Sequence, residues 1–326
     1  MTRCSAPGKM ILLGEHAVVF GKPALALAID LRIYSEVTPS PQYSVNWHPM
    51  KKKHHAYISA ALDEAWGGPP INVETISEIP SGSGLGSSAA VTVSCIAAML
   101  VRKGKLDAEK VARMAFEVEN SVQGRASPTD TSTSCHGFGI LVSPEKSDGF
   151  LWKIEKDHRQ WNIHHCDVPK LTFVVGYTGI HAATGPLVAK VKRLVDEKAD
   201  AKKAVDRIGE IVIEGVDATK TADKKRLGKL MDEDHQLLKE LGVSHPLLDK
   251  FVEACAPKSY GAKLTGAGGG GSMIALTDDP DAVSAAIAAA GGEPIRIEVG
   301  CEGARVEKSS RSGKQSPEGF ARKPED

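Results

Sequence analysis

The segment Ile79–Val101, IPSGSGLGSSAAVTVSCIAAMLV, contains no charged residue and decides how the chain is interpreted. Its length would suit a membrane span, because a helix needs about 20 predominantly apolar residues to cross a bilayer. Its first third is mostly glycine and serine, however, and the strongly apolar part begins only near Ala89. Two other interpretations therefore stay open: a nucleotide-binding loop that leads into a helix, or a turn followed by a buried core helix.

The glycines at the start of this segment favour the nucleotide loop. Gly82, Gly84 and Gly86 allow positive φ angles and a close approach of the backbone to a ligand. Ser87 and Ser88 begin the expected helix, whose first amide groups have no partner within the helix. A helix N-terminus favours anions, and hydroxyl oxygens suit Mg²⁺ beside phosphate groups. The loop is not a Walker A sequence, because no Lys-Ser or Lys-Thr follows the glycines.

The composition is that of a globular protein large enough for two domains. The 326 residues include 41 Lys and Arg and 41 Asp and Glu, so no net charge attracts nucleic acid or a membrane surface. The start of the chain, MTRCSAPGK, lacks the apolar core of a signal peptide. Six scattered cysteines without a CxxC pair indicate reduced, apolar side chains. We therefore expect a cytoplasmic protein.

Periodicity predicts alternating strands and helices. Alternation over Ile71–Ser77 predicts a strand, and Ser87–Val101 has no polar face, as in a helix buried on all sides. Asp107 is a suitable N-cap for a helix that continues to Asn120. This order predicts an α/β protein of two-layer, α+β domains. Further strands are expected over Gly139–Ser143, Leu171–Thr178 and Ser272–Leu276, and helices over Thr184–Gly242 with breaks at Gly215 and Asp217–Asp223.

A second glycine-rich segment, KLTGAGGGGSM, covers Lys263–Met273. Gly266, Gly268 and Gly271 match the pattern G-x-G-x-x-G, which indicates dinucleotide binding only where it opens a helix. Here the pattern leads into an expected strand, so we reject that interpretation. The glycines then either pack tightly against another element or line a site where a ligand leaves no room for side chains.

Four charged or titratable residues stand in unusual surroundings. Glu119 flanks the apolar stripe of its helix, so it either reaches water at the edge or turns inward, where it needs a cation or hydrogen bonds. Asp130, in ASPTDTSTSC, is either a capping residue or a buried acid beside space for a substrate. Taken alone, Lys9 would be solvated and His16 would be a hydrogen-bonded structural histidine.

Three stretches, in this order, resemble the superfamily of galactokinase, homoserine kinase, mevalonate kinase and phosphomevalonate kinase. They are APGKMILLGEHAVVFG (Ala6–Gly21), PSGSGLGSSAA (Pro80–Ala90) and KLTGAGGGG (Lys263–Gly271). Within the superfamily GEHAVVFG resembles mevalonate kinases, and SPTDTSTS resembles the segment where their archaeal-type sequences carry the catalytic aspartate. The segment GYTGIHAATGPLVAKV (Gly176–Val191) resembles the one that contributes a threonine to their substrate side.

The resemblance implies a role for each matching residue. Asp130 would accept or orient the proton of the attacking C5 hydroxyl group, and Lys9 beside it would stabilise the developing charge. Ser88 and Glu119 would hold Mg²⁺ against the phosphates. The residues implied to bind ATP are Pro80, Ser81, Gly82, Ser83, Gly84, Leu85, Gly86, Ser87 and Ser88. The residues implied to bind the substrate are Glu15, His16, Thr184 and Gly266.

The resemblance also implies the fold and the activity. We expect the GHMP-kinase two-domain fold, with an ATP-binding domain over residues 1–168, a second domain over 169–307 and a disordered tail over 308–326. The active site would lie in the cleft between the domains. The expected reaction is ATP-dependent phosphorylation of (R)-mevalonate to (R)-5-phosphomevalonate in isoprenoid biosynthesis, by a cytoplasmic homodimer that uses Mg²⁺ and binds neither nucleic acid nor membrane.

Other activities stay open. A phosphomevalonate kinase or a mevalonate 3-kinase would share these motifs, and an inactive member of the superfamily could serve as a ligand sensor. Retention of Lys9, Ser88, Glu119 and Asp130 together argues against the sensor. One departure concerns the substrate side: family members often carry Gly-Gly soon after the aspartate segment, whereas this chain has SCHGFG, with His136 and Phe138.

Overall fold

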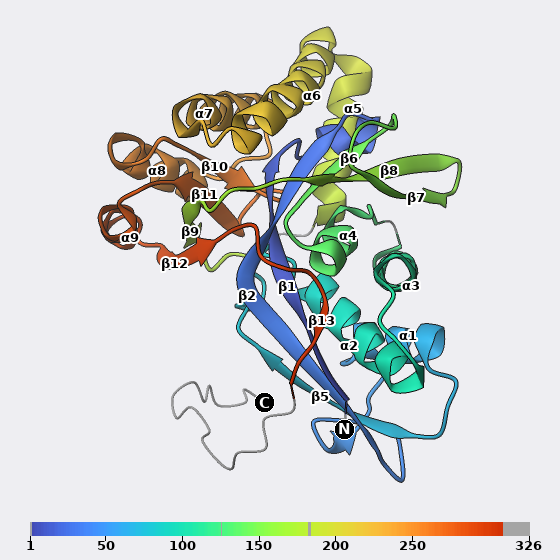
Figure 1. The fold of residues 1–326 in the computed structure, drawn as a ribbon. Helices are drawn as coiled ribbons and strands as arrows, with labels where there is room; N and C mark the ends of the chain where they lie inside the picture. The colour runs from blue at the N-terminus through green and yellow to red at the C-terminus, as the bar shows by residue number, and fades with distance from the viewer. Residues whose placement is uncertain (1, 125, 182–183, 309–326) are drawn as a thin grey trace.

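The computed structural model describes residues 2–124, 126–181 and 184–308 (Figure 1). These residues form two β-sheets, each covered by helices, as the mixed α/β expectation requires. The larger sheet has the order β4-β3-β5-β2-β6-β8-β7, with β1 paired to β2 and β13 paired to β1. Its strands are β1 Thr2–Leu13, β2 Ala24–Pro39, β3 Ser44–Val45, β4 His48–Pro49, β5 Ile71–Ser77, β6 Gly139–Ser143, β7 Phe150–Lys156, β8 Arg159–Cys166 and β13 Arg305–Val306.

The helices of the first half pack on one side of β1 and β2 (Figure 1). The central helix, α2, is buried at Ala89, Ala90 and 92–100, and it contacts β1, β2 and the three helices around it. In the described part of the chain, no helix is both long enough and apolar enough to cross a membrane. Ile79–Val101 is thus a glycine-rich loop followed by a core helix. The helices are α1 Ala56–Ala65, α2 Ser87–Lys103, α3 Ala108–Gln123 and α4 Thr129–His136, with a short 3-10 turn, η1, at Ala17–Phe20.

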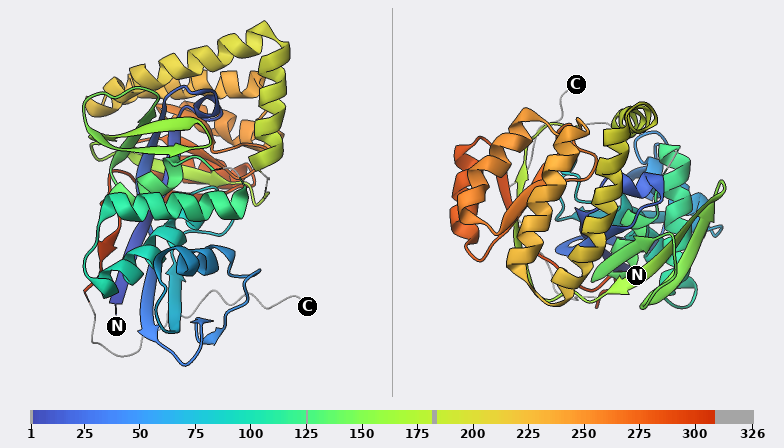
Figure 2. Two further views of the ribbon diagram at one scale, coloured as in Figure 1. Left: turned by 90° about the vertical axis from the view of Figure 1, so that its right-hand side faces the viewer. Right: turned by 90° about the horizontal axis from the view of Figure 1, so that it is seen from above.

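The second sheet is antiparallel, with the order β10-β11-β9-β12. Helices α7 and α8 pack against β10, and α9 packs against β9 and β12. Figure 2 shows α5 to α7 gathered at the end of the molecule opposite the N-terminus. The elements are β9 Thr172–Tyr177, α5 Thr184–Glu197, α6 Ala199–Lys220, α7 Lys224–Glu240, α8 Pro246–Cys255, η2 Ala256–Lys258, β10 Gly261–Thr265, β11 Ser272–Leu276, α9 Pro280–Ala289 and β12 Glu293–Glu298.

Most of the expected elements are confirmed, but the helical region over 184–242 is divided differently, with breaks at Lys198 and at 221–223. The strands over 71–77, 139–143 and 272–276 have the predicted bounds, and the Asp107 side chain accepts a hydrogen bond from the Lys110 amide as an N-cap. The helix break at Gly215 is wrong, because α6 runs through it to Lys220. A Cβ atom at Gly215 would lie 2.1 Å from Leu13 Cδ1, so this glycine allows α6 to pack closely on the end of β1.

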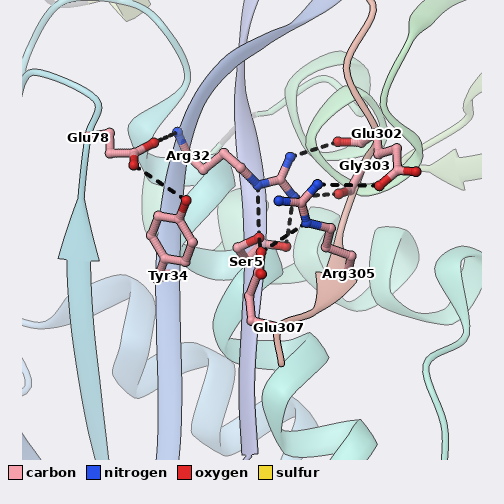
Figure 3. A network of polar contacts seen from close by, with 8 residues as sticks. All are labelled: Ser5, Arg32, Tyr34, Glu78, Glu302, Gly303, Arg305 and Glu307. Atoms are coloured by element: carbon pink, nitrogen blue, oxygen red, sulfur yellow. Dashed lines mark hydrogen bonds and ion pairs between the residues drawn. The ribbon is translucent and has the colours of Figure 1, made fainter. Parts of the chain in front are cut away.

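The last described residues return to the first sheet. β13 pairs with β1, and isolated bridges join Ile29 to Val299 and Gly137 to Glu302. Beneath this segment lies Arg32 on β2, a residue only 5% exposed (Figure 3). The expected tail over 308–326 lies outside the described residues, apart from Lys308.

The Arg32 guanidinium group holds the returning segment in place. It donates hydrogen bonds to the carbonyl oxygens of Glu302 (2.9 Å) and Gly303 (2.7 Å) and to Ser5 Oγ (2.8 Å). Ser5 Oγ in turn donates to the Glu307 carboxylate, as the dashed lines in Figure 3 show. We call Arg32, Ser5, Glu302, Gly303 and Glu307 the Arg32 clasp.

Candidate functional site

Lys9 on β1 is the centre of the site. It is 3% exposed, and its Nζ atom lies 3.2 Å from Asp130 Oδ2. The Lys9 amide donates to the Leu85 carbonyl (2.9 Å), and its Nζ donates to the Gly84 carbonyl (3.4 Å). The structure therefore brings the first motif, the glycine loop and the aspartate segment into direct contact.

Gly86 determines how closely the loop approaches Lys9. Its φ angle is +77°, and a Cβ atom at this position would lie 2.7 Å from Lys9 Cγ. Gly86 is also the N-cap of α2, and no side chain caps this helix end. The first amide groups of α2 are thus left for another acceptor beside a buried ammonium group. A helix N-terminus and a lysine together favour a phosphate group.

Ser88 and Glu119 form the second part of the site. Ser88 Oγ donates to Glu119 Oε1 at 3.1 Å, and Glu119 is 2% exposed on α3. Glu119 therefore faces inward, which is the alternative in which its carboxylate needs a cation or hydrogen bonds. Burial, and secondarily the charge of Asp130, raises the pKa of Glu119 to about 8.

These oxygen donors fit a magnesium ion. A buried carboxylate beside a second carboxylate is stabilised by a cation, and Mg²⁺ usually takes one or two carboxylates together with substrate phosphates and water. Within residues 2–124, 126–181 and 184–308, no three His, Cys, Asp or Glu side chains cluster in a way that could hold a metal. Ser88 and Glu119 thus suit an ion that arrives with phosphate better than a closed protein cage.

Asp130 lies in the first turn of α4 and is 32% exposed. An acid in the first turn is stabilised by the unpaired amide groups of the helix. Its other neighbours on α4 are mostly small hydroxyl side chains that are themselves buried. Asp130 is therefore neither the N-cap of α4, which is Pro128, nor a fully buried acid; it stands in the first turn and faces the buried ammonium group of Lys9.

Tyr57 on α1 was not predicted as a site residue. Its hydroxyl group accepts a hydrogen bond from Gln123 Nε2 (3.2 Å) and also interacts with Ser88 and Glu119. Burial, followed by the charge of Glu119, raises the pKa of Tyr57. Its sequence surroundings, AYISAALDEA, are those of an ordinary amphipathic helix, so only the packing of α1 against α2 and α3 places Tyr57 here.

The turn after β1 carries Glu15 and His16. Glu15 is fully buried and forms an ion pair with Lys263 of β10. His16 Nε2 donates to the carbonyl oxygen of Ala267 at 2.9 Å, which leaves Nδ1 as a buried acceptor without a protein partner among the described residues. Burial lowers the pKa of His16, in agreement with a neutral ring.

The second glycine segment packs against its surroundings. A Cβ atom would lie 2.0 Å from the Val243 carbonyl oxygen at Gly268 and 2.8 Å from Ile180 at Gly270. Ser272 Oγ donates to the Ser83 carbonyl (2.6 Å), which joins this segment to the first glycine loop. Close packing therefore accounts for these two glycines.

Gly266 and Thr184 differ from the other predicted site residues. A Cβ atom at Gly266 would meet nothing within 4 Å, and Thr184 is exposed at the start of α5. In the described part of the chain, no hydrogen bond or ion pair links either residue to Lys9, Asp130, Ser88 or Glu119. The structure thus brings together the four charged or metal-binding candidates but does not join the whole substrate side to them.

The arrangement suits transfer of a phosphoryl group. It combines an uncapped helix N-terminus, a buried ammonium group, a carboxylate 3.2 Å from that ammonium and a carboxylate-hydroxyl pair. Phosphoryl transfer requires positioning and charge neutralisation more than covalent chemistry from the protein.

Comparisons with known proteins agree with this chemistry. Residues 54–138 match the GHMP kinases N terminal domain, and residues 216–294 match the GHMP kinases C terminal domain. The chain is 37% identical to the mevalonate kinase of Pyrococcus abyssi, over 93% of this chain and 97% of the relative. It is 35% identical to the mevalonate kinase of Archaeoglobus fulgidus, over 90% of this chain and 99% of the relative.

A solved mevalonate kinase structure is also similar to this chain. The crystal structure of L. major mevalonate kinase in complex with R-mevalonate superposes with a TM-score of 0.77. The two proteins are 26% identical, and the match covers 92% of this chain and 96% of the other.

Proposed function

The chain belongs to the mevalonate kinase family of the GHMP kinases, and on this premise we propose that it transfers the γ-phosphoryl group of ATP to the 5-hydroxyl group of (R)-mevalonate. The observation that carries the proposal is the contact of Lys9 with Asp130 beside the uncapped N-terminus of α2. The product is (R)-5-phosphomevalonate, an intermediate of isoprenoid biosynthesis.

In the reaction that we propose, Asp130 is the catalytic base or orienting group. A bond forms between the C5 oxygen and the γ-phosphorus while the bond from that phosphorus to the β–γ bridging oxygen breaks, and ADP leaves with the electron pair. The hydroxyl proton passes to Asp130. Lys9 stabilises the charge that develops on the transferred group, because its ammonium group is buried and already positioned.

The glycine loop, residues 80–88, is proposed to bind the triphosphate through its amide groups and the first turn of α2. Ser88 and Glu119 would hold Mg²⁺, which when bound neutralises phosphate charge. Tyr57 extends this set, since its hydroxyl group interacts with Ser88 and Glu119.

The substrate side is proposed to include His16, Thr184 and Gly266. The Nδ1 acceptor of His16 has no protein partner among the described residues, so it suits a hydroxyl group of the substrate. Gly266 precedes Ala267, to which His16 bonds, and a Cβ atom at Gly266 would meet nothing within 4 Å. Glu15 is fully buried, so it would lie behind these residues. We also retain residues 1–168 and 169–307 as the two proposed domains, with the cleft between them as the site.

Two properties of the whole protein stay predictions. A homodimer would appear in sedimentation velocity as a single species of twice the chain mass. A cytoplasmic location would appear in fractionation as recovery with cytoplasmic marker enzymes.

The substrate itself is tested by a panel of acceptors with ADP release as the readout. We expect strong turnover of (R)-mevalonate and a product phosphorylated at C5, identified by ³¹P NMR. Turnover of 5-phosphomevalonate alone, or a product phosphorylated at C3, would overturn the proposal and assign a neighbouring kinase activity. Absence of ADP release with every acceptor, while ATP still binds, would favour a ligand-sensing protein.

A further inference from the structure

A buried cluster of three charged side chains joins the two halves of the molecule away from the phosphoryl-transfer residues. Glu15 comes from the turn after β1, Lys263 from β10 and Asp234 from α7, and all three side chains are 0% exposed. Lys263 Nζ contacts Glu15 Oε1 closely and lies 3.4 Å from Asp234 Oδ2. Among the described residues, Glu15 Oε2 and both Asp234 carboxylate oxygens have no hydrogen-bond partner.

The formal charges of this cluster do not balance. Two ionised carboxylates against one ammonium group would leave a net negative charge in a region without water contact, which costs several kcal/mol. The neighbouring groups do not supply the missing positive charge. His235 Nδ1 accepts from the Leu264 amide and its Nε2 faces Asp249, and burial lowers the pKa of His235 to about 4.

The other titratable neighbours face elsewhere. Asp232, on the same helix, is exposed and accepts from the Ala262 amide. Lys239 pairs with Asp249 at 3.1 Å, and His16 is a neutral ring bonded to Ala267. Lys263 is therefore the single cation that faces Glu15 and Asp234 among the described residues.

We propose that Glu15 and Asp234 share one proton, carried by Asp234, and that with Lys263 they form a proton-dependent clasp that positions His16 on the substrate side. Glu15 Oε1 accepts a hydrogen bond from the Lys263 ammonium group, whereas neither Asp234 oxygen has a hydrogen-bond partner among the described residues, so we assign the charge to Glu15 and the proton to Asp234. Burial raises the pKa of Asp234 to about 8; the charge of Lys263 opposes this shift and the charge of Glu15 adds to it.

The cluster of Glu15, Asp234 and Lys263 holds the turn that carries His16. Next to the cluster, Thr265 Oγ1 accepts from the Ile11 amide and donates to the Ile11 carbonyl, and His16 bonds to Ala267. The end of β1 is thus fixed to β10 and to the glycine segment that follows it. Loss of the shared proton would leave two like charges facing each other and would loosen this turn. Asp234, Lys263 and Glu15 are in this sense positioning residues that act through His16.

The proton is tested directly by infrared spectroscopy of the full-length protein. The carbonyl stretching band of a protonated carboxyl group is expected at pH 7 in wild type and should be weakened in Asp234→Asn. Asp232→Asn, an exposed neighbour on the same helix, is the matched control and should keep the band. An unchanged band in Asp234→Asn would show that Asp234 is ionised and would overturn the proposal.

Glu15→Gln tests the same proton from the other side. Without the Glu15 charge, Asp234 becomes the sole partner of Lys263 and ionises, so the band should be weakened in this variant too. Retention of the full band in a folded Glu15→Gln protein would contradict proton sharing.

Folding should report the proton that Asp234 carries. Asp234 holds a proton in the folded state between its ordinary pKa and about 8 that the unfolded chain has lost, so its contribution to stability falls as pH rises through this range. Asp234→Asn should lower the number of protons taken up on folding at pH 7 by one, measured from the pH dependence of unfolding. An unchanged proton uptake would overturn the assignment.

The effect on substrate binding rests on the proposed function. In wild type the KM for mevalonate should rise several-fold above pH 8 with a smaller change in kcat, and Asp234→Asn should remove this rise. A pH-dependent KM that persists in Asp234→Asn would refute the positioning role. If mevalonate is not turned over at all, the infrared and folding measurements still decide the proton, so the two failures are distinguishable.

Discussion

At the scale of single residues, Lys9, Asp130 and Glu119 share one partly buried region and influence one another's charge. Lys9 lies 3.2 Å from Asp130, and the charge of Asp130 contributes to the raised pKa of Glu119. The Lys9 ammonium group therefore stabilises the negative charge of two carboxyl groups. Binding of nucleotide with a cation would add further charges to this region, so substitution of each residue should have a different effect on activity and binding.

Asp130→Asn should separate proton transfer from nucleotide binding. The change removes the proton acceptor and its charge but preserves the size of the side chain. Since general-base contributions are about 10²–10⁴-fold, kcat should fall by at least the lower figure while the Kd for ATP stays near wild type. Lys9→Met should also lower kcat strongly, whereas Lys22→Met, at a partly exposed lysine that pairs with Asp206, should not. Near-normal kcat in Asp130→Asn would exclude it as the catalytic centre.

Glu119→Gln should change both the pH dependence of stability and the response to magnesium. The raised pKa of about 8 means that folded Glu119 keeps a proton that the unfolded chain releases near its ordinary value of 4.5. Its stabilising contribution is therefore lost as pH rises from about 4.5 towards 8, at up to about 1.4 kcal/mol per pH unit. At pH 8, without ligand, the variant should melt at a higher temperature than wild type.

The same variant should respond less to Mg²⁺ with nucleotide. Wild type should gain several degrees in Tm when both are added, and Glu119→Gln should lose most of this gain together with activity. Glu117→Gln, at a partly exposed position on the same helix that pairs with Lys156, is the control. An equal magnesium response in wild type and Glu119→Gln would remove Glu119 from the metal site.

At the scale of elements, the junction between the glycine loop and α2 decides the geometry of the site. The loop turns through the positive φ angles of Gly82, Gly84 and Gly86, and α2 begins at once. Gly86 additionally lies against the stem of Lys9, so its missing side chain is a packing requirement as well as a backbone one.

Gly86→Ala and Gly84→Ala form a matched pair. Both have φ near +76°, so each alanine should cost about 1–2 kcal/mol of backbone strain. Only the Cβ atom at position 86 meets Lys9, at 2.7 Å, whereas that at position 84 meets nothing within 4 Å. Overpacking should add about 1–3 kcal/mol to the cost of Gly86→Ala. Equal loss of unfolding free energy in urea, without nucleotide, would show that Lys9 moves aside freely.

At the scale of the whole molecule, the chain crosses from the second sheet back to the first. The segment after Val299 follows the second sheet in sequence but pairs with β1 and is held by the Arg32 clasp. A proposed boundary at residue 168 therefore separates two sheets that the C-terminal segment still connects.

Arg32→Met should destabilise the whole protein. It would leave the carbonyl groups of Glu302 and Gly303 without their donor in a buried region, with a loss on the order of 3–5 kcal/mol in unfolding free energy. Arg305→Met removes a half-exposed arginine from ion pairs with Glu302 and Glu307 and should cost about 1 kcal/mol or less. Denaturant titration of both variants measures the difference; comparable losses would contradict the role of the Arg32 clasp.

Truncation after Glu307 should have little effect. The sequence KSSRSGKQSPEGFARKPED, residues 308–326, has almost no apolar side chain to bury. We expect Tm within about 1 °C of wild type and unchanged kcat, since a shift of that size corresponds to less than about 1 kcal/mol for a chain of this length. A fall of many degrees in differential scanning calorimetry would show that these residues stabilise the folded body.

The sequence by itself determined the fold class, the family and most of the phosphoryl-transfer candidates. The strand Ile71–Ser77 was predicted to the residue from its alternation of apolar and polar side chains, and Gly139–Ser143 from its short apolar run, because both patterns are local properties of the sequence. The glycine loop was recognisable because glycine at closely spaced positions permits backbone conformations that other residues adopt rarely.

Only the tertiary structure decided the features that depend on a distant partner. Gly215 continues a helix because Leu13 packs against it, and Tyr57 joins the site because α1 packs on α2 and α3. The shared charge of Glu15, Lys263 and Asp234 exists only once three separate elements exclude water from it. Local periodicity records which face of an element is buried, but the free energy of a buried charge or a close contact is set by whatever lies across the interface.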